Sequence, residues 1–170
     1  MNPSSTIRSL AGIATGLALA GTVVALTPAT GSAAAAATCT ATNLYVVKGR
    51  LEGAAGSRFL TVKVTNVGDD ACSAGIATKA AFRDFDGLLG TPGDVSGGSG
   101  LVTLDPGETA KAVIHWTDPG PVPAEDCQEA SATLVTFRVP SLRHTWRLPL
   151  EAQVCTTADF RPDSKPLVGP

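Results

Sequence analysis

Residues 59–66 read FLTVKVTN and residues 109–117 read TAKAVIHWT, and these two stretches decide the fold. In both, apolar side chains recur at every second position, and polar side chains fill most of the positions between them. This period of two is typical of a half-buried β-strand, because successive side chains point to opposite faces of a sheet. Helix signals are almost absent after residue 38, so the sequence predicts an all-β domain.

Further strands are expected around these two. Aliphatic and aromatic runs between Gly- and Pro-rich turns predict strands at 44–51, 101–104, 132–139 and 145–151. The segment 75–85 also fits a helix, but its flanking glycines favour a strand closed by a turn at 86–87. Pro149 has no N–H to donate to a neighbouring strand, which places the last strand at a sheet edge.

Short strands with a turn about every 8–12 residues indicate an immunoglobulin-like two-sheet β-sandwich of about seven to eight strands. The Gly-, Ser- and Pro-rich segment 88–100 and the Pro-rich segment 118–127 are expected to be exposed loops. The sandwich is expected to span residues 38–160. Residues 161–170 are expected to form a flexible, Pro-rich C-terminal tail.

The chain begins with the features of a cleavable secretory signal peptide. Arg8 precedes the apolar run 10–26, and the small residues 33–37 offer A-x-A frames for signal peptidase. We therefore expect residues 1–37 to be removed, with the cut between positions 33 and 37. The protein is then secreted to the extracellular space, where it is free or associated with the cell wall.

Two other readings of this N-terminal region stay open. The apolar run approaches the roughly 20 residues of a membrane-spanning helix, although it holds three glycines and no positive cluster follows it. The second alternative is a lipid anchor on Cys39. Thr38 disfavours that anchor, because it stands where the lipidation signal requires Gly, Ala or Ser.

The charge of the chain argues against two classes of partner. The 13 basic and 15 acidic residues give a net charge of −2, and removal of Arg8 makes it −3. Binding to nucleic acid or to an anionic lipid surface depends on clustered Lys and Arg. We therefore expect no nucleic-acid partner, no membrane partner after cleavage, and a monomer that binds an unknown protein or cell-wall component.

Four cysteines lie downstream of the predicted cut, and an even number in an exported chain indicates disulfides. Cys39 and Cys72 fall at the open end of one predicted hairpin, which favours a bond between them. Cys127 and Cys155 bracket the last two predicted strands in the same way. Each bond closes a loop of roughly 30 residues and stabilises the domain by about 3–4 kcal/mol. A zinc site normally needs closely spaced cysteines, and these are far apart.

Several segments occur in an order that resembles a known family. They are Cys39, TNVGDDAC at 65–72, FDG at 85–87, VTLDPGETAKAVIHW at 102–116, Cys127 and Cys155. Together they resemble an actinobacterial family of small secreted domains, the domain-of-unknown-function family 4232, some members of which are lipoproteins. The resemblance covers about residues 39–160. It implies a β-sandwich with two disulfides and no established activity or site.

One candidate binding surface is a basic and aromatic cluster near the last predicted hairpin. Its members are Arg138, Arg143, His144, Trp146 and Arg147. Such a patch suits an anionic glycan or a protein, whereas the alternative is that its arginines only offset nearby acids. The loops at 90–100 and 118–126 are further candidates, because a sandwich displays its variable residues on loops.

The sequence gives no catalytic, cofactor-binding or metal-binding assignment. Neither of the two histidines, His115 and His144, has the spacing of a metal site. Asp84 and Asp86 flank Phe85 and are interpreted as a turn with Asx hydrogen bonds, rather than as an acid–base pair. The motifs G-x-S-x-G and H-E-x-x-H and the P-loop do not occur. We expect a protein that is not an enzyme and has no cofactor.

These observations lead to three hypotheses for function. The first is a non-enzymatic extracellular module that binds a protein or a cell-envelope component. The second is a secreted hydrolase or hydrolase inhibitor that acts through an exposed loop, and the third is a structural envelope protein without a specific ligand. A histidine within hydrogen-bond reach of both a serine and an aspartate would favour the hydrolase.

Overall fold

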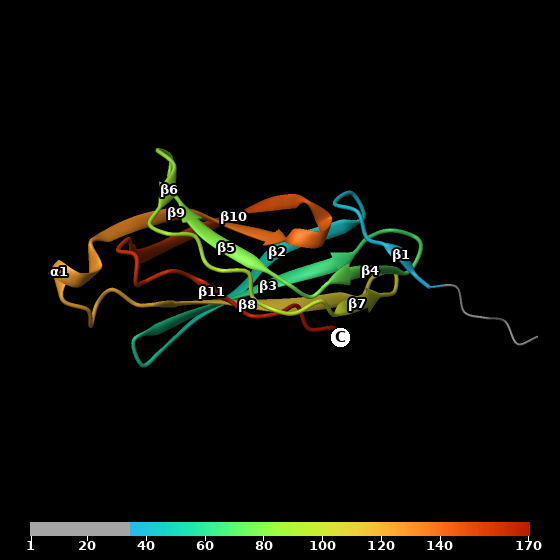
Figure 1. Cartoon of the computed structure of the whole chain (residues 1–170), viewed down its shortest axis with the longest axis horizontal. Helices are drawn as coiled ribbons and strands as arrows, with labels where there is room; N and C mark the ends of the chain where they lie inside the picture. The colour runs from blue at the N-terminus through green and yellow to red at the C-terminus, as the bar shows by residue number, and fades with distance from the viewer. Residues whose placement is uncertain (1–34) are drawn as a thin grey trace, which may run out of the picture. The chain divides into compact units, whose positions relative to one another are not determined.

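A computed structural model of the chain describes residues 35–170. The predicted signal peptide, residues 1–37, lies outside the described residues except for its last three positions, so its cleavage stays a prediction. The described residues form eleven strands and two short helices (Figure 1). In chain order these elements are β1 (Ala37–Thr38), β2 (Leu44–Ala54), β3 (Ser57–Asn66), β4 (Cys72–Gly75), β5 (Lys79–Arg83), β6 (Leu88–Leu89), β7 (Leu101–Leu104), β8 (Thr109–Thr117), α1 (Ala124–Cys127), β9 (Glu129–Val139), the 3₁₀ turn η1 (Pro140–Leu142), β10 (His144–Cys155) and β11 (Asp163–Ser164).

The strands form a β-sandwich, as the sequence predicts. One four-stranded sheet has the order β10-β9-β5-β6, and the other has the order β11-β8-β3-β2. Their buried side chains form one hydrophobic core. A smaller sheet of order β1-β4-β7 lies at one end of the sandwich, where the N-terminal end of the described chain enters (Figure 1). This third sheet was not predicted from the sequence.

The two stretches with a period of two supply the centre of the core. Leu60 of β3 lies opposite Ile114 of β8, and both side chains are fully buried. Every second residue is also buried from Leu60 to Asn66 in β3 and from Ala110 to Trp116 in β8. Trp116 of β8 meets Phe82 of β5 edge to face, with ring centroids 5.2 Å apart, and so joins the two sheets. Full burial of each such side chain contributes about 1.5–3 kcal/mol.

The segment that the sequence left between helix and strand is a strand, β5, closed by a turn. The expected edge position of the last long strand is also confirmed, because β10 ends its sheet and a register shift follows Pro149.

The expected exposed loop 88–100 is only partly a free loop. Ser96 exchanges backbone hydrogen bonds of 2.8 and 2.9 Å with Thr78, and the N–H of Gly93 donates to the carbonyl of Ala80 at 2.9 Å.

Both predicted disulfides are present. Cys39 bonds to Cys72 with 4.9 Å between Cα atoms, and Cys127 bonds to Cys155 with 4.6 Å between Cα atoms. The hairpin argument holds, because β2 pairs with β3 and β9 pairs with β10 over most of their lengths. A lipid anchor on Cys39 requires its thiol to be free. The disulfide to Cys72 uses this sulfur and therefore disfavours the lipid anchor.

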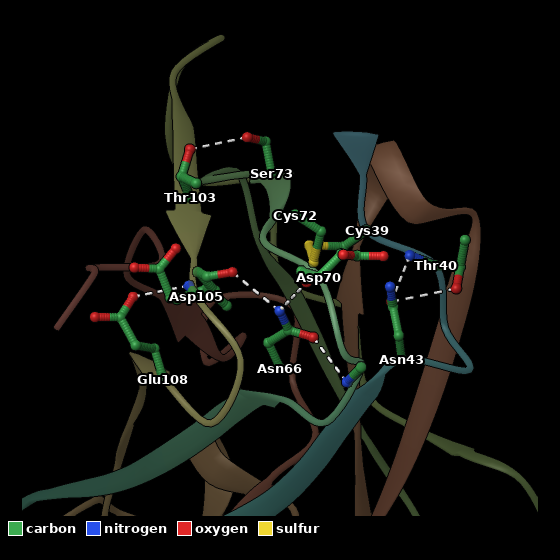
Figure 2. Close-up of a disulfide and its surroundings, with 12 residues drawn as sticks. Cys39, Thr40, Asn43, Asn66, Asp70, Cys72, Ser73, Thr103, Asp105 and Glu108 are labelled. Atoms are coloured by element: carbon green, nitrogen blue, oxygen red, sulfur yellow. Dashed lines mark hydrogen bonds between the residues drawn. A yellow bond between two sulfur atoms is a disulfide. The ribbon is translucent and has the colours of Figure 1, made fainter. Parts of the chain in front are cut away.

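Two segments of the family resemblance meet around the buried side chain of Asn66, which Figure 2 shows beside the first disulfide. Its amide donates to the carbonyls of Asp70 at 2.8 Å and Leu104 at 2.9 Å. Its side-chain oxygen accepts the N–H of Gly68 at 2.9 Å. Asn66 thus satisfies three backbone groups and fixes the turn that leads β3 toward Cys72. The occurrence of Asn66 in the family-like segment 65–72 is therefore explained by this structural role.

Residues 161–170 are part of the sandwich, and the prediction of a flexible tail is wrong. β11 pairs with β8, and the N–H of Val168 donates to the carbonyl of Lys111 at 2.8 Å. Leu167 is only 2% exposed, and its N–H donates to the carbonyl of Ile76 at 2.8 Å. The prolines do not prevent this pairing, because a proline lacks only its own N–H and the residues between the prolines still donate.

Candidate functional site

The outer face of the sheet β10-β9-β5-β6 gathers four cations. The register places Thr145, Arg138 and Lys79 side by side on β10, β9 and β5. Arg147 follows on β10 and Arg83 on β5, each an even number of residues further along, so they share this face. The alternate positions of these strands point into the core. We call the set Lys79, Arg83, Arg138 and Arg147 the basic face.

The basic face carries no partner charge within the described residues. Four ion pairs occur in residues 35–170, and none includes a member of the basic face. They are Arg50–Glu52, Arg58–Asp118, Arg161–Asp94 and Lys165–Asp163. The carboxylate nearest in sequence, Asp84, accepts the backbone N–H groups of Asp86 and Gly87 at 2.9 and 2.8 Å. The positive charge of this face is therefore left for a ligand or for solvent.

A shallow groove of about 250 Å³ runs over the basic face. Its lining includes three of the four cations, Lys79, Arg83 and Arg138, together with Thr145 and Leu88. Arg147 lies on the same face outside this lining. Neighbouring strands are about 4.8 Å apart and residues about 3.3 Å apart along a strand. The four Cα atoms therefore span an area of roughly 10 Å by 13 Å.

The predicted cluster of basic and aromatic residues is divided by the sheet. Arg138 and Arg147 lie on the basic face. Trp146 lies on the inner side, with its ring centroid 6.4 Å from that of Phe137, and His144 meets Trp146 edge to face at 4.8 Å. Arg143 lies in the turn after η1 with φ of 51°. The structure thus places only two of the five predicted residues, Arg138 and Arg147, on the basic face, and His144 pairs with Trp146 away from it.

Strand β5 also contributes to this surface, which was not predicted from the sequence. Lys79 and Arg83 are four residues apart in the sequence KAAFR, so a strand places them on one face. The shared face of Lys79 and Arg83 could therefore be predicted once residues 75–85 were interpreted as a strand. The position of β5 beside β9 could not be predicted, because the paired residues of the two strands are 51 to 59 positions apart in the sequence and neither strand's sequence specifies their register.

A second and larger hollow of about 540 Å³ lies where the ends of the β2–β3 and β9–β10 hairpins face each other. Leu51, Ala132 and Ala152 give it apolar walls, and Glu129 and Glu151 give it carboxylates. The Nε of Arg58, also in the lining, donates to the carboxylate of Asp118 at 2.7 Å. This cleft includes part of the Pro-rich loop that the sequence analysis proposed as a binding surface.

The two histidines lie apart from both hollows. His115 stacks at a tilt on Phe59, with ring centroids 4.9 Å apart. Within residues 35–170, neither imidazole forms a hydrogen bond with a serine or a carboxylate. Asp84 and Asp86 form the expected Asx turn.

Two further features concern metal sites and membrane spans. Residues 35–170 contain no group of three or more His, Cys, Asp or Glu side chains placed to hold a metal ion. No helix in that part of the chain is long and apolar enough to cross a bilayer.

Comparison with known proteins gives a family but no activity. No curated protein matches the chain. A family described as a domain of unknown function, DUF4232, matches residues 39–168. This match takes in both disulfides, the Asn66 turn and most of the C-terminal segment that pairs with β8. The chain belongs to the DUF4232 family.

Proposed function

We propose that this protein is exported from an actinobacterial cell and acts as a non-enzymatic module that binds an anionic glycan of the cell envelope. The observation that carries the proposal is the basic face. Its four cations lie within roughly 10 Å by 13 Å, and no carboxylate of residues 35–170 pairs with them. A polymer with repeated anionic groups reaches all four, whereas a single phosphate or carboxylate reaches only one or two.

The choice of a glycan rests on the remaining chemistry of the groove. The exposed hydroxyl of Thr145 lies beside the cations and suits the hydroxyl groups of a sugar. Arginine also binds planar or branched anions through two parallel hydrogen bonds, which suits uronate, sulfate and phosphate groups alike. The shallow groove suits a linear chain that lies across a sheet.

Export is supported by the two disulfides. Such bonds persist in oxidising compartments and are rare in a reducing cytosol. An envelope glycan is then a ligand within reach of the exported protein.

A direct test measures binding to dextran sulfate and to dextran, which has the same sugar backbone without the charges. The protein is produced from its full-length chain in an exporting host, so that both disulfides form. The wild type should bind dextran sulfate and not dextran. The double variant K79Q/R138Q removes two cations that face each other on neighbouring strands and should weaken this binding at least tenfold at low salt.

The other sheet provides a matched control. Lys63 and Lys111 also face each other on neighbouring strands, β3 and β8. K63Q/K111Q therefore makes the same change in net charge on another surface, and it should leave binding within about twofold of the wild type. Equal losses in the two double variants, or equal binding to dextran, would refute the proposal.

The alternative of a hydrolase or hydrolase inhibitor would place its chemistry in the cleft of about 540 Å³, where Glu129 and Glu151 lie. Hydrolysis of a glycan by the wild type that is lost in both E129Q and E151Q would favour the hydrolase over the binding module.

A further inference from the structure

Phe85 is the most exposed large apolar side chain of the described residues, with 94% of its surface accessible. It lies at the tip of the turn between β5 and β6, which projects from the body of the domain (Figure 1). Leu88, three residues on, is 47% exposed. A single exposed apolar residue is ordinary on a protein surface, but an aromatic ring held away from the core is a candidate anchor for a ligand.

The turn that presents Phe85 is fixed without any help from its ring. The carboxylate of Asp84 accepts the N–H groups of Asp86 and Gly87, and the N–H of Asp84 donates to the carbonyl of Gly87 at 3.1 Å. Gly87 has φ of 147°, a value that favours glycine. Because backbone and carboxylate bonds hold the tip, the backbone of the turn loses little freedom on binding, and removal of the ring leaves the turn intact.

Phe85 also lies next to the basic face. Arg83 and Leu88 pair across β5 and β6, and both line the groove of the basic face. Phe85 is two residues beyond Arg83, a distance of about 7 Å along the chain. A ligand that lies in the groove and extends past Arg83 therefore reaches the aromatic ring.

We propose that Phe85 stacks on a sugar ring, so that the ligand of the basic face is a polyanion built of pyranose units. A pyranose has a face of C–H groups that packs flat on an aromatic ring, and aromatic contacts of defined geometry add to the gain from buried area. A polyanion without rings, such as a chain of phosphates, gains nothing from Phe85. This inference rests on the proposed function and adds the chemical class of the ligand.

The acids beside Phe85 fit this assignment. Asp86 is exposed, and Asp84 is partly compensated by the two N–H groups that it binds. Negative charge at the tip disfavours insertion of Phe85 into an anionic lipid surface. A sugar ring whose charged group points back toward Arg83 avoids this repulsion and still covers the aromatic ring.

The test compares two polyanions that differ in having rings. Dextran sulfate consists of sulfated pyranoses, and inorganic polyphosphate has no ring. F85A should weaken binding of dextran sulfate about tenfold and binding of polyphosphate less than twofold. F85W keeps a flat ring and should bind dextran sulfate within about twofold of the wild type, whereas F85L should resemble F85A. Since Phe85 is almost fully exposed, the melting temperature should not change in any of the three.

The outcomes separate this inference from the proposed function. K79Q/R138Q should weaken binding of both probes, because both are anionic. If the wild type binds both probes and F85A has the same effect on each, or no effect on dextran sulfate, the stacking role of Phe85 is wrong and the basic face stands. If the wild type binds neither probe, the proposed function itself fails.

Discussion

Removal of the two disulfides tests how the domain holds together. The bonds Cys39–Cys72 and Cys127–Cys155 close loops with sequence separations of 33 and 28 residues. In the chain-entropy model these loops correspond to about 3.7 and about 3.6 kcal/mol at 25 °C. Because neither loop overlaps the other, the denatured chain loses its two constraints independently, and the costs should add to about 7 kcal/mol.

This sum is large beside the stability of an ordinary domain. Small domains unfold with about 5–15 kcal/mol, so one missing bond should leave a folded but weakened protein. Loss of both should leave it at or near the point of unfolding. Three variants separate these cases: C39A/C72A, C127A/C155A and the variant with all four alanines. Paired replacement avoids a free thiol that would form wrong bonds.

Urea unfolding followed by tryptophan fluorescence measures the three costs. Trp116 is 2% exposed and joins the two sheets, so its emission reports the loss of the sandwich. A cost below about 1 kcal/mol for either paired variant would refute the chain-entropy reasoning. A departure from additivity above about 1 kcal/mol would show that the two ends of the sandwich are coupled, contrary to the separate loops.

Three other variants test the remaining arguments. N66A should lower the free energy of unfolding by about 2–4 kcal/mol, because it leaves three backbone groups without their hydrogen-bond partner. A loss below about 0.5 kcal/mol in urea unfolding would contradict this prediction. L167A should cost about 2–5 kcal/mol in the same assay, since the C-terminal segment is packed, whereas the exposed neighbour V168A should cost little. D86N should strengthen dextran sulfate binding about twofold at low salt, because it removes an exposed negative charge beside Phe85. It should have no effect at 1 M salt, where exposed charges are screened. A weaker affinity of D86N would count against a ligand at the β5–β6 turn.

The parts of the fold that could be predicted are those that depend on residues close together in the sequence. The alternation around Leu60 and Ile114 identifies the two central strands, because the period of side chains is fixed by the backbone. The disulfide pairing followed from hairpins between neighbours in sequence. The C-terminal strand β11 could not be found in this way, since two residues show no period and their partner strand lies almost 50 residues earlier.

The candidate site shows the same division between local and long-range information. Alternation along β10 alone indicates that Arg147 and the pair His144 and Trp146 point to opposite faces of the sheet. Their nearness in sequence was the only basis for grouping these residues. Lys79 joins Arg138 only through the register of β5 with β9, which the rest of the fold decides. A basic face made by three strands is therefore recognised only after those strands are assembled.

The proposed glycan partner depends on the local arrangement of charge on the assembled sheet. The net charge of −3 after cleavage, which argues against nucleic acid and anionic lipid surfaces as partners, describes the chain as an average. At an ionic strength of 0.1 M, however, charges act over about 10 Å, which is close to the width of the basic face. A polyanion in the groove is therefore influenced mainly by the four nearby cations, and the acids elsewhere are largely screened. For the proposed polyanion, net charge would set the long-range repulsion during encounter, whereas the arrangement of cations on the sheet would set the affinity of the complex.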